Sequence, residues 1–218
     1  MTQLLVSRLC HDLVGPVGAV NAGLELLQGE AGKGALDTDA LALATKSADQ
    51  MGRKVVFFRV AFGAGLSGRD GPLAEALTLT QGFLADRNIR FDGSELPAAL
   101  ARGDMSAGTA QIIAKVFLNL VLLGADSLPR GGSLTMTLEP KNDAFFLNMG
   151  ATGDRAGLRS ETVAGLEATT TEGLDARSIH GFFAKKLVEG AGGGLEAQSL
   201  SQGEGGEIVF RAGPFPSI

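Results

Sequence analysis

The N-terminal part of the chain carries two stripes of apolar side chains. Within each stripe they recur at steps of three and four residues, the spacing of one face of an α-helix. The polar segment 28–39 separates the stripes, and Asp37 or Asp39 could cap the second helix. The first stripe is Leu5, Leu9, Leu13, Val17, Val20, Leu24 and Leu27; the second is Leu41, Ala44, Ala48, Met51, Val55, Phe58 and Phe62. The pattern predicts a helical hairpin.

Two helices alone would leave much of this apolar seam in water. The second stripe also has the repeat of a coiled-coil seam. The simplest way to cover both stripes is a second copy of the chain, which would give a four-helix bundle about a two-fold axis. We therefore expect a homodimer.

The pattern changes after the glycine-rich segment 62–71. Helical periodicity predicts helices over residues 71–88, 106–128 and 178–192, the second too apolar to be anything but buried. Short apolar or alternating runs predict strands over 89–93, 131–139, 144–150, 194–200 and 206–213. Helices and strands mix without regular β-α alternation, so the fold class expected is α+β, a sandwich behind a helical hairpin. The expected domains are residues 1–66 and 70–218.

Composition narrows the classes of function. The chain has 218 residues, of which 44% are hydrophobic, and a formal net charge of −5. A packed globule is expected, and binding to nucleic acid is not. No stretch of about 18 consecutive apolar residues suggests a membrane span, and no signal peptide is recognisable at the N-terminus. The single cysteine, Cys10, cannot form an internal disulfide, which fits the cytoplasm.

The candidate chemistry lies at His11. It is two residues from both Leu9 and Leu13, so it points about 200° away from the first stripe, into solvent. An exposed, neutral imidazole can attack phosphorus and hold a phosphoryl group. The neighbouring Asp12 could orient the ring, or instead form a salt bridge or cap. Since Pro16 cannot donate to the carbonyl of Asp12, a bend is expected there. A plain surface histidine is the alternative.

The order of the residues favours chemistry. The stretch "CHDLVGPVGAVNAGLELL" resembles the phospho-acceptor box of dimeric sensor histidine kinases, S-H-E-L-x-x-P-L-x-x-I. The matching positions, in order, are His11, Asp12, Leu13, Pro16, Val17 and Val20.

The second half resembles the Bergerat-type ATPase domain of the same kinases, but without its working residues. Asn119 matches the first asparagine of the asparagine box, whereas Leu123 stands at the Mg²⁺-binding asparagine. Met149 stands at the adenine-binding aspartate and Ala151 at a glycine of the first glycine box, and the second glycine box is missing. Leucine cannot hold Mg²⁺, which needs oxygen ligands. We expect no ATP, no other cofactor and no metal on this chain.

A phospho-acceptor hairpin joined to a degenerate ATPase domain resembles the ChpT-type histidine phosphotransferases of bacterial phosphorelays. The resemblance implies a homodimer that moves a phosphoryl group between receiver domains of hybrid kinases and response regulators. It implies that Mg²⁺ belongs to the receiver. The catalytic candidates are His11 and Asp12, and the receiver-binding candidates are Arg8, Val14, Gly15 and Gly18. Arg8 could pair with the receiver, or be an ordinary solvated charge.

Two other functions stay open: a divergent ATP-dependent histidine kinase, and a pseudo-kinase that docks regulators without chemistry. Of the remaining residues, Cys10 is expected at the helix seam and His180 at the surface. Phe57, Phe58 and Phe62 are expected in the core at the domain junction.

Overall fold

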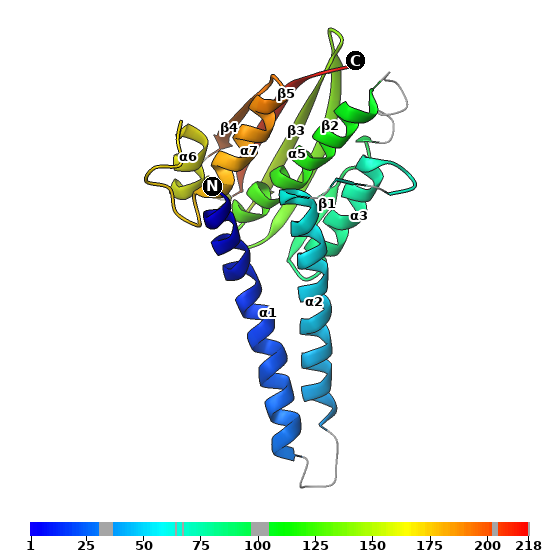
Figure 1. Ribbon diagram of the computed structural model, residues 1–218, viewed down its shortest axis with the longest axis vertical. Coiled ribbons are helices and arrows are strands. Elements are labelled where there is room, and N and C mark those ends of the chain that lie inside the picture. The colour runs from blue at the N-terminus through cyan, green and yellow to red at the C-terminus, as the bar shows by residue number, and fades with distance from the viewer. Residues whose placement is uncertain (31–36, 64, 67, 97–104, 202–204, 218) are drawn as a thin grey trace.

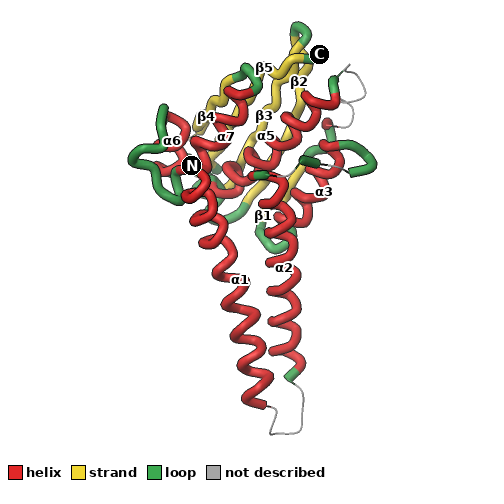
Figure 2. The backbone as a smooth tube through the Cα atoms, viewed as in Figure 1, coloured by secondary structure: helices red, strands yellow, loops and turns green. Residues whose placement is uncertain are grey.

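The protein is a long helical hairpin standing on a two-layer domain of helices and strands (Figures 1 and 2). The computed structural model describes residues 1–30, 37–63, 65–66, 68–96, 105–201 and 205–217. The described helices are α1 Thr2–Glu30, α2 Thr38–Phe62, α3 Pro72–Leu84, α5 Ala107–Asp126, α6 Ser160–Glu167 and α7 Ile179–Gly190. The strands are β1 Ile89–Asp92, β2 Gly132–Lys141, β3 Ala144–Gly153, β4 Gly194–Ser201 and β5 Gly206–Pro216.

The hairpin consists of α1 and α2, as the stripes predict. Asp37 is the N-cap of α2: its Oδ1 accepts from the backbone N–H groups of Asp39 and Ala40, both at 3.0 Å. Near the tip the helices meet closely at Gly23, where a Cβ would lie 2.8 Å from the carbonyl oxygen of Ala40. Of the predicted polar connection, residues 31–36 lie outside the described residues.

Part of each stripe remains uncovered in the single chain. Several large apolar side chains of the hairpin are more than 40% exposed: Val6, Val14, Val17, Leu24, Leu26, Leu41, Leu43, Val55 and Val56. Val17, Leu24, Leu41 and Val55 belong to the predicted stripes. The hairpin thus presents an apolar surface that its own two helices do not bury.

The second domain is an α+β sandwich, which confirms the predicted fold class. Its sheet has the order β1-β2-β3-β5-β4; β1 is parallel to β2, and the other neighbouring strands are antiparallel. Buried side chains alternate along β2 and β3. One face of the sheet is therefore packed against α5 and α7, and the other is more exposed. The predicted division at residues 66 and 70 falls between α2 and α3 and stays a prediction.

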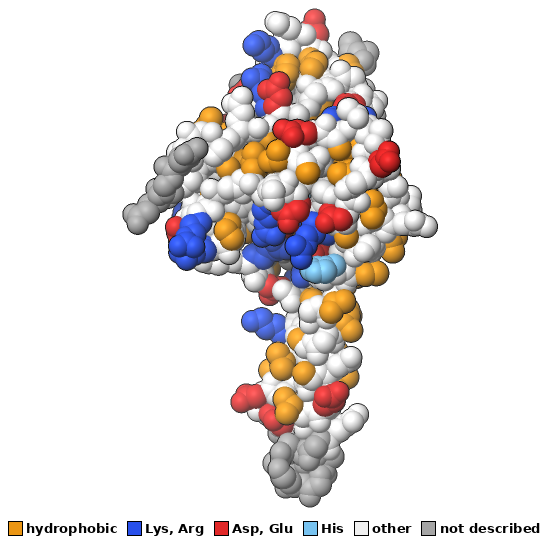
Figure 3. Space-filling model, turned by 90° about the vertical axis from the view of Figure 1, so that its left-hand side faces the viewer, with side chains coloured by type: hydrophobic (Ala, Val, Ile, Leu, Met, Phe, Trp, Pro, Cys, Tyr) orange, Lys and Arg blue, Asp and Glu red, His pale blue; other side chains and the backbone are white. Residues whose placement is uncertain are grey.

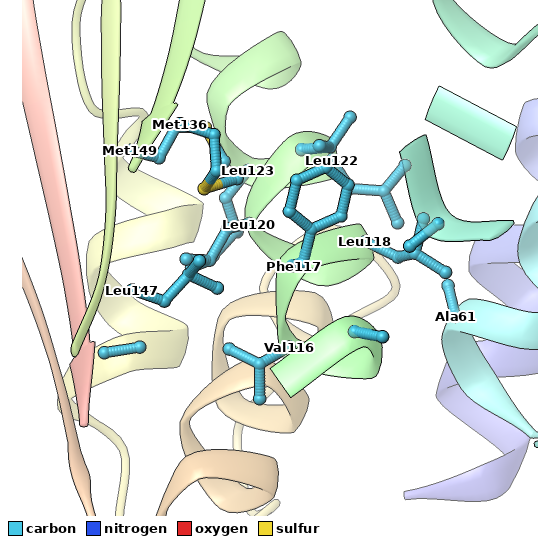
Figure 4. Packing of buried hydrophobic residues seen from close by; sticks show 14 of the residues in the cluster. Ala61, Val116, Phe117, Leu118, Leu120, Leu122, Leu123, Met136, Leu147 and Met149 are labelled. Atoms are coloured by element: carbon cyan, nitrogen blue, oxygen red, sulfur yellow. The ribbon is translucent and has the colours of Figure 1, made fainter. Parts of the chain in front are cut away.

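Helix α5 forms the centre of the core. Ser106 caps it, its Oγ accepting from the N–H of Thr109 at 3.1 Å. Of the helices described, α5 has the length and hydropathy to span a bilayer, yet 67% of that window is buried inside the fold. Figure 4 shows Leu120 and Leu123 directed toward Leu147, Met136 and Met149 of the sheet, and Leu118 directed toward Ala61 of α2. The prediction of a buried helix over 106–128 is confirmed.

The aromatic junction between the two domains also agrees with the sequence. Phe57 and Phe58 are buried, and the ring of Phe57 stacks on Phe83 of α3 with 4.2 Å between centroids. Phe62 is partly buried and packs its ring edge against Phe183 of α7. The end of α2 is thereby fixed to the second domain.

Helix α6 was not expected from the sequence. It has only eight residues, and its N-cap residue Arg159 makes no side-chain capping hydrogen bond. Packing against the start of α7 holds it in place. The two backbones are so close that a Cβ on Gly165 would lie 2.0 Å from the carbonyl oxygen of Ser178. The contact that stabilises α6 is therefore tertiary and leaves little local signal.

Truncation in the core tests this packing. Leu120 is fully buried in α5, so Leu120→Ala should lower the free energy of unfolding by about 2–5 kcal/mol. Leu200→Ala is the matched control, because Leu200 is 58% exposed, and it should change that energy by less than about 0.5 kcal/mol. Urea denaturation measures both. Equal losses in the two variants would contradict the assigned core.

Candidate functional site

His11 lies on the outer surface of α1, where the hairpin meets the second domain. Its side chain is 76% exposed. Beside it is a cleft of about 470 Å³, bounded by α1, the end of α5, α6 and the turn before α7. Figure 3 shows the exposed histidine next to a group of basic and acidic side chains. The cleft is lined by Arg8, His11, Asp12, Asp126, Arg159, Glu161, Thr162, Asp175, Ala176 and Arg177.

Arg8 joins α1 to α5. Its Nε donates to Oδ2 of Asp12 at 2.9 Å, and its Nη2 donates to Oδ2 of Asp126 at 2.6 Å. Burial disfavours the charged guanidinium, but Asp126 and Asp12 outweigh that effect and raise the pKa of Arg8 above its ordinary value. Arg8 is thus a largely buried cation held by two carboxylates, rather than a solvated charge.

Asp12 is turned toward Arg8 rather than toward the imidazole. Its Oδ1 lies 3.9 Å from Nδ1 of His11, beyond hydrogen-bond distance. Of the roles the sequence left open, the salt bridge is the one present in this structure. Orientation of the imidazole by Asp12 stays a prediction.

A lysine compensates for the proline in α1. The helix continues through Pro16 without interruption. Pro16 has no N–H to donate to the carbonyl oxygen of Asp12, and this oxygen accepts from Nζ of Lys54 at 3.2 Å instead. Burial and then the charge of Arg87 lower the pKa of Lys54. Sequence reasoning missed Lys54. The signal for it was the proline itself, because the carbonyl oxygen four residues before a proline lacks its helical hydrogen bond and needs another donor.

Of the four predicted receiver-binding positions on α1, Val14, Gly15 and Gly18 share one exposed surface with His11, whereas Arg8 is held in the cleft. Val14 is 68% exposed. Gly15 and Gly18 are exposed too, and a Cβ at either would meet nothing within 4 Å. The surface beside His11 is consequently low and open, as the sequence predicts, with one apolar side chain on it. No contact in the structure tests receiver binding itself.

The opposite wall of the cleft supplies arginines that sequence reasoning did not find. Nη1 of Arg177 lies 3.6 Å from Oε1 of Glu161, and the side chain of Arg177 is 69% exposed. Arg159 is exposed, and its guanidinium has no hydrogen bond or ion pair with any other described residue. Both arginines are more than a hundred residues from His11 in the sequence, and only the fold brings them near it.

Two expectations about single residues were wrong. His180 is buried, not at the surface: its Nε2 lies 3.2 Å from Oδ1 of Asn119. Asn119 in turn donates from Nδ2 to the carbonyl oxygens of Ala61 and Lys115, both at 2.9 Å. Cys10 is exposed, because it lies beside the apolar stripe and not in it.

The positions aligned with nucleotide ligands lie in the apolar core. Leu123 and Met149 are buried, and in Figure 4 they lie together with Met136 between α5 and the sheet. A Cβ on Gly124 would lie 2.6 Å from the sulfur of Met149, so α5 and β3 are in close contact. Within the described part of the chain, no three His, Cys, Asp or Glu side chains group as a metal site would require.

The family follows from comparison of the whole domain. The family model of the histidine phosphotransferase C-terminal domain matches residues 73–202. The chain belongs to this family. It is 36% identical to Protein phosphotransferase ChpT of Brucella abortus (strain 2308) over 137 residues, which is 62% of this chain and 59% of that protein. The chain thus spans about 59% of the length of that curated relative.

One solved structure agrees with the fold over nearly the whole chain. A bacterial phosphotransferase solved at 1.7 Å superposes with a TM-score of 0.74 and 28% identity, over 97% of this chain and 95% of that one. The catalytic domain of the histidine kinase ThkA superposes with a TM-score of 0.43 and 18% identity, over 66% of this chain and 92% of that one. The second similarity is too low to support any argument.

The buried His180 should make stability depend on pH. Burial is the main cause that lowers its pKa from 6.5 to about 3. Between these values the unfolded chain binds a proton that the folded chain does not, so the free energy of unfolding falls as pH falls. From about pH 7 to about pH 5 this loss should be roughly 1–2 kcal/mol in the wild type.

Urea unfolding of His180→Gln checks this, since glutamine can still donate to Asn119 but does not titrate. The loss between the two pH values should be smaller in His180→Gln by that amount. His11→Gln is the control for removing a histidine from the surface. If His180→Gln keeps the full pH dependence of the wild type, the buried neutral histidine is not its source.

Proposed function

We propose that this chain is a histidine phosphotransferase that carries a phosphoryl group on His11 between the aspartates of two receiver domains. The observation that carries the proposal is an imidazole 76% exposed on α1, beside an open surface and a charged cleft. Membership of the histidine phosphotransferase family supports it, as does the similarity to a protein named as a phosphotransferase.

The reaction needs little from this chain beyond position. A lone pair on a nitrogen of neutral His11 attacks the phosphorus of a receiver's phospho-aspartate. An N–P bond forms, the P–O bond breaks, and the aspartate leaves as a carboxylate. Attack by an aspartate of a second receiver reverses these steps. Mg²⁺ would be held by the receiver, where it would neutralise charge on the phosphoryl oxygens.

The open surface around His11 suits such a partner. An in-line attack requires the receiver's backbone to approach α1 closely, and Gly15 and Gly18 offer no side chain in the way. The exposed Val14 gives an apolar contact beside them. Arg8 acts indirectly in this account, because its guanidinium is already held by Asp12 and Asp126. We expect the reaction in the cytoplasm.

ATP has no part in the proposed reaction. Oxygen ligands for Mg²⁺ and an acceptor for adenine are replaced by Leu123 and Met149, both in the core. This favours transfer from a receiver over the alternative of a divergent histidine kinase. The second alternative, docking without chemistry, gives no reason for a histidine at the open surface of α1.

We further propose that the working form is a homodimer. The exposed part of the stripes continues into a groove of about 490 Å³ between α1, α2 and α7. Its apolar lining is Met1, Leu5, Val6, Leu9, Leu13, Val55, Phe58, Phe62 and Phe183. Pairing of two such hairpins would cover the exposed members of this lining, such as Val6 and Val55, and leave both His11 side chains on the outside.

Removal of His11 tests the function. A receiver domain carrying labelled phosphate is mixed with the protein and Mg²⁺, with a parallel reaction that contains only labelled ATP. Wild type should acquire acid-labile label from the receiver and none from ATP, whereas His11→Gln should acquire none from either. Label from ATP alone would support the kinase alternative, and no label from any of several receivers would support the docking alternative.

Charges placed in the stripe test the dimer. Val17→Glu and Leu24→Glu should each raise the dimer dissociation constant by roughly 100-fold, about 2.8 kcal/mol, because an unpaired carboxylate would be buried at the seam. Sedimentation equilibrium measures it. Val14→Glu is the matched control on the His11 surface and should remain dimeric. A monomeric wild type would rule out the seam as an interface.

A further inference from the structure

The bridge from Arg8 to Asp126 goes beyond an incidental ion pair. We propose that Asp126 is a positioning residue for phosphotransfer: through Arg8 it holds the helix that carries His11 in a fixed orientation against the cleft. This inference rests on the proposed function and concerns how His11 is positioned at the same site.

The bridge lies one turn from the apolar contact between α1 and the second domain. Near its N-terminus, Leu5 packs in a small apolar cluster with Ile179, Phe182 and Phe183. Arg8 is three residues further along, on the same side as His11. Its bond to Asp126 spans 118 residues of sequence. Leu5 and Arg8 thus hold α1 at two successive points, and His11 comes one turn after the second.

The chemistry of the bridge suits a device that fixes orientation. A guanidinium is planar and can donate in two directions at once, here to Asp12 on its own helix and to Asp126 on α5. The side chains of Arg8, Asp12 and Asp126 are only 15%, 23% and 19% exposed. Solvent and salt therefore screen this pairing less than they screen a surface pair.

The place of Asp126 also points to a role outside its own helix. It is the last residue of α5, and a carboxylate is electrostatically unfavourable at the negative end of a helix. The cation of Arg8 compensates for that repulsion. Since α5 is the buried centre of the domain, Asp126 is a rigid point to which α1 can be attached.

The consequence concerns how a receiver meets the site. One part of the composite surface is α1 around His11, and the other is the cleft wall with Arg159 and Arg177. With the bridge intact, both parts are in place before the receiver arrives. Without it, the receiver must order them on binding, and His11 is misplaced for part of the time.

The experiment compares two phosphate donors on the same variants. Labelled receiver requires the whole surface, whereas phosphoramidate is small and needs only a reactive His11. Asp126→Asn should lower kcat/KM for transfer from the receiver by roughly 10- to 100-fold. Labelling by phosphoramidate should change by less than about twofold, because the imidazole itself is unaltered. Asp126→Glu, which restores the charge, should recover much of the receiver reaction.

The matched control is Asp154→Asn. It breaks the ion pair between Arg130 and Asp154, in which Nη1 lies 2.7 Å from Oδ2. This pair lies wholly within the second domain, and both side chains are about half exposed. Both reactions should stay near the wild-type rates in this variant. Arg8→Lys is a second test should Asp126→Asn fail to fold. It keeps one charge but cannot hold both carboxylates in the same geometry, and it should also lose receiver transfer selectively.

Three results would overturn the inference. One is receiver transfer at the wild-type rate in Asp126→Asn. Another is an equal loss with both donors in a variant whose circular dichroism and melting match the wild type, since that places Asp126 in the chemistry of His11. A third is a wild type that takes label from phosphoramidate but from no receiver, which overturns the proposed function and the inference with it.

Discussion

The buried helix α5 positions the other parts of the molecule. Asn119, Leu123 and Asp126 follow one another along one side of this helix at steps of four and three residues. Asn119 binds the end of α2 and faces His180 of α7, Leu123 packs against the sheet, and Asp126 holds Arg8 of α1. One side of a core helix therefore positions both helices of the hairpin.

Burial of α5 also determines where apolar and polar side chains lie around the site. At positions where the resembling kinases carry nucleotide ligands, the core here is closed by apolar side chains, while the polar groups gather at the end of α5 and around α1. His11 is exposed because it points away from the apolar stripe, and neighbouring residues hold its helix. Arg8 does so through its guanidinium, and Asp12 through its carbonyl oxygen, which accepts from Nζ of Lys54. The reactive group remains free while the backbone beneath it is held.

Local patterns predicted most of the elements and the exposure of His11, but not the contacts between the elements. The two stripes, the cap at Asp37 and the apolar run of α5 are short-range signals, and each was confirmed. The partners of Arg8, the lysine beneath Pro16 and the cleft arginines depend on residues far apart in sequence. His180 was misjudged because a buried histidine needs a distant acceptor, Asn119, which periodicity does not reveal. Helix α6 depends on packing rather than on its own residues.

In the proposed reaction, His11 carries the phosphoryl group from one aspartate to another. A complete relay tests it most directly: a phosphorylated donor receiver, an unphosphorylated acceptor receiver, and this chain in catalytic amount. The acceptor should gain phosphate only when the chain is present, with a transient acid-labile phosphohistidine that mass spectrometry maps to His11. Equal transfer with His11→Gln, or a phosphohistidine at any other position, would contradict it.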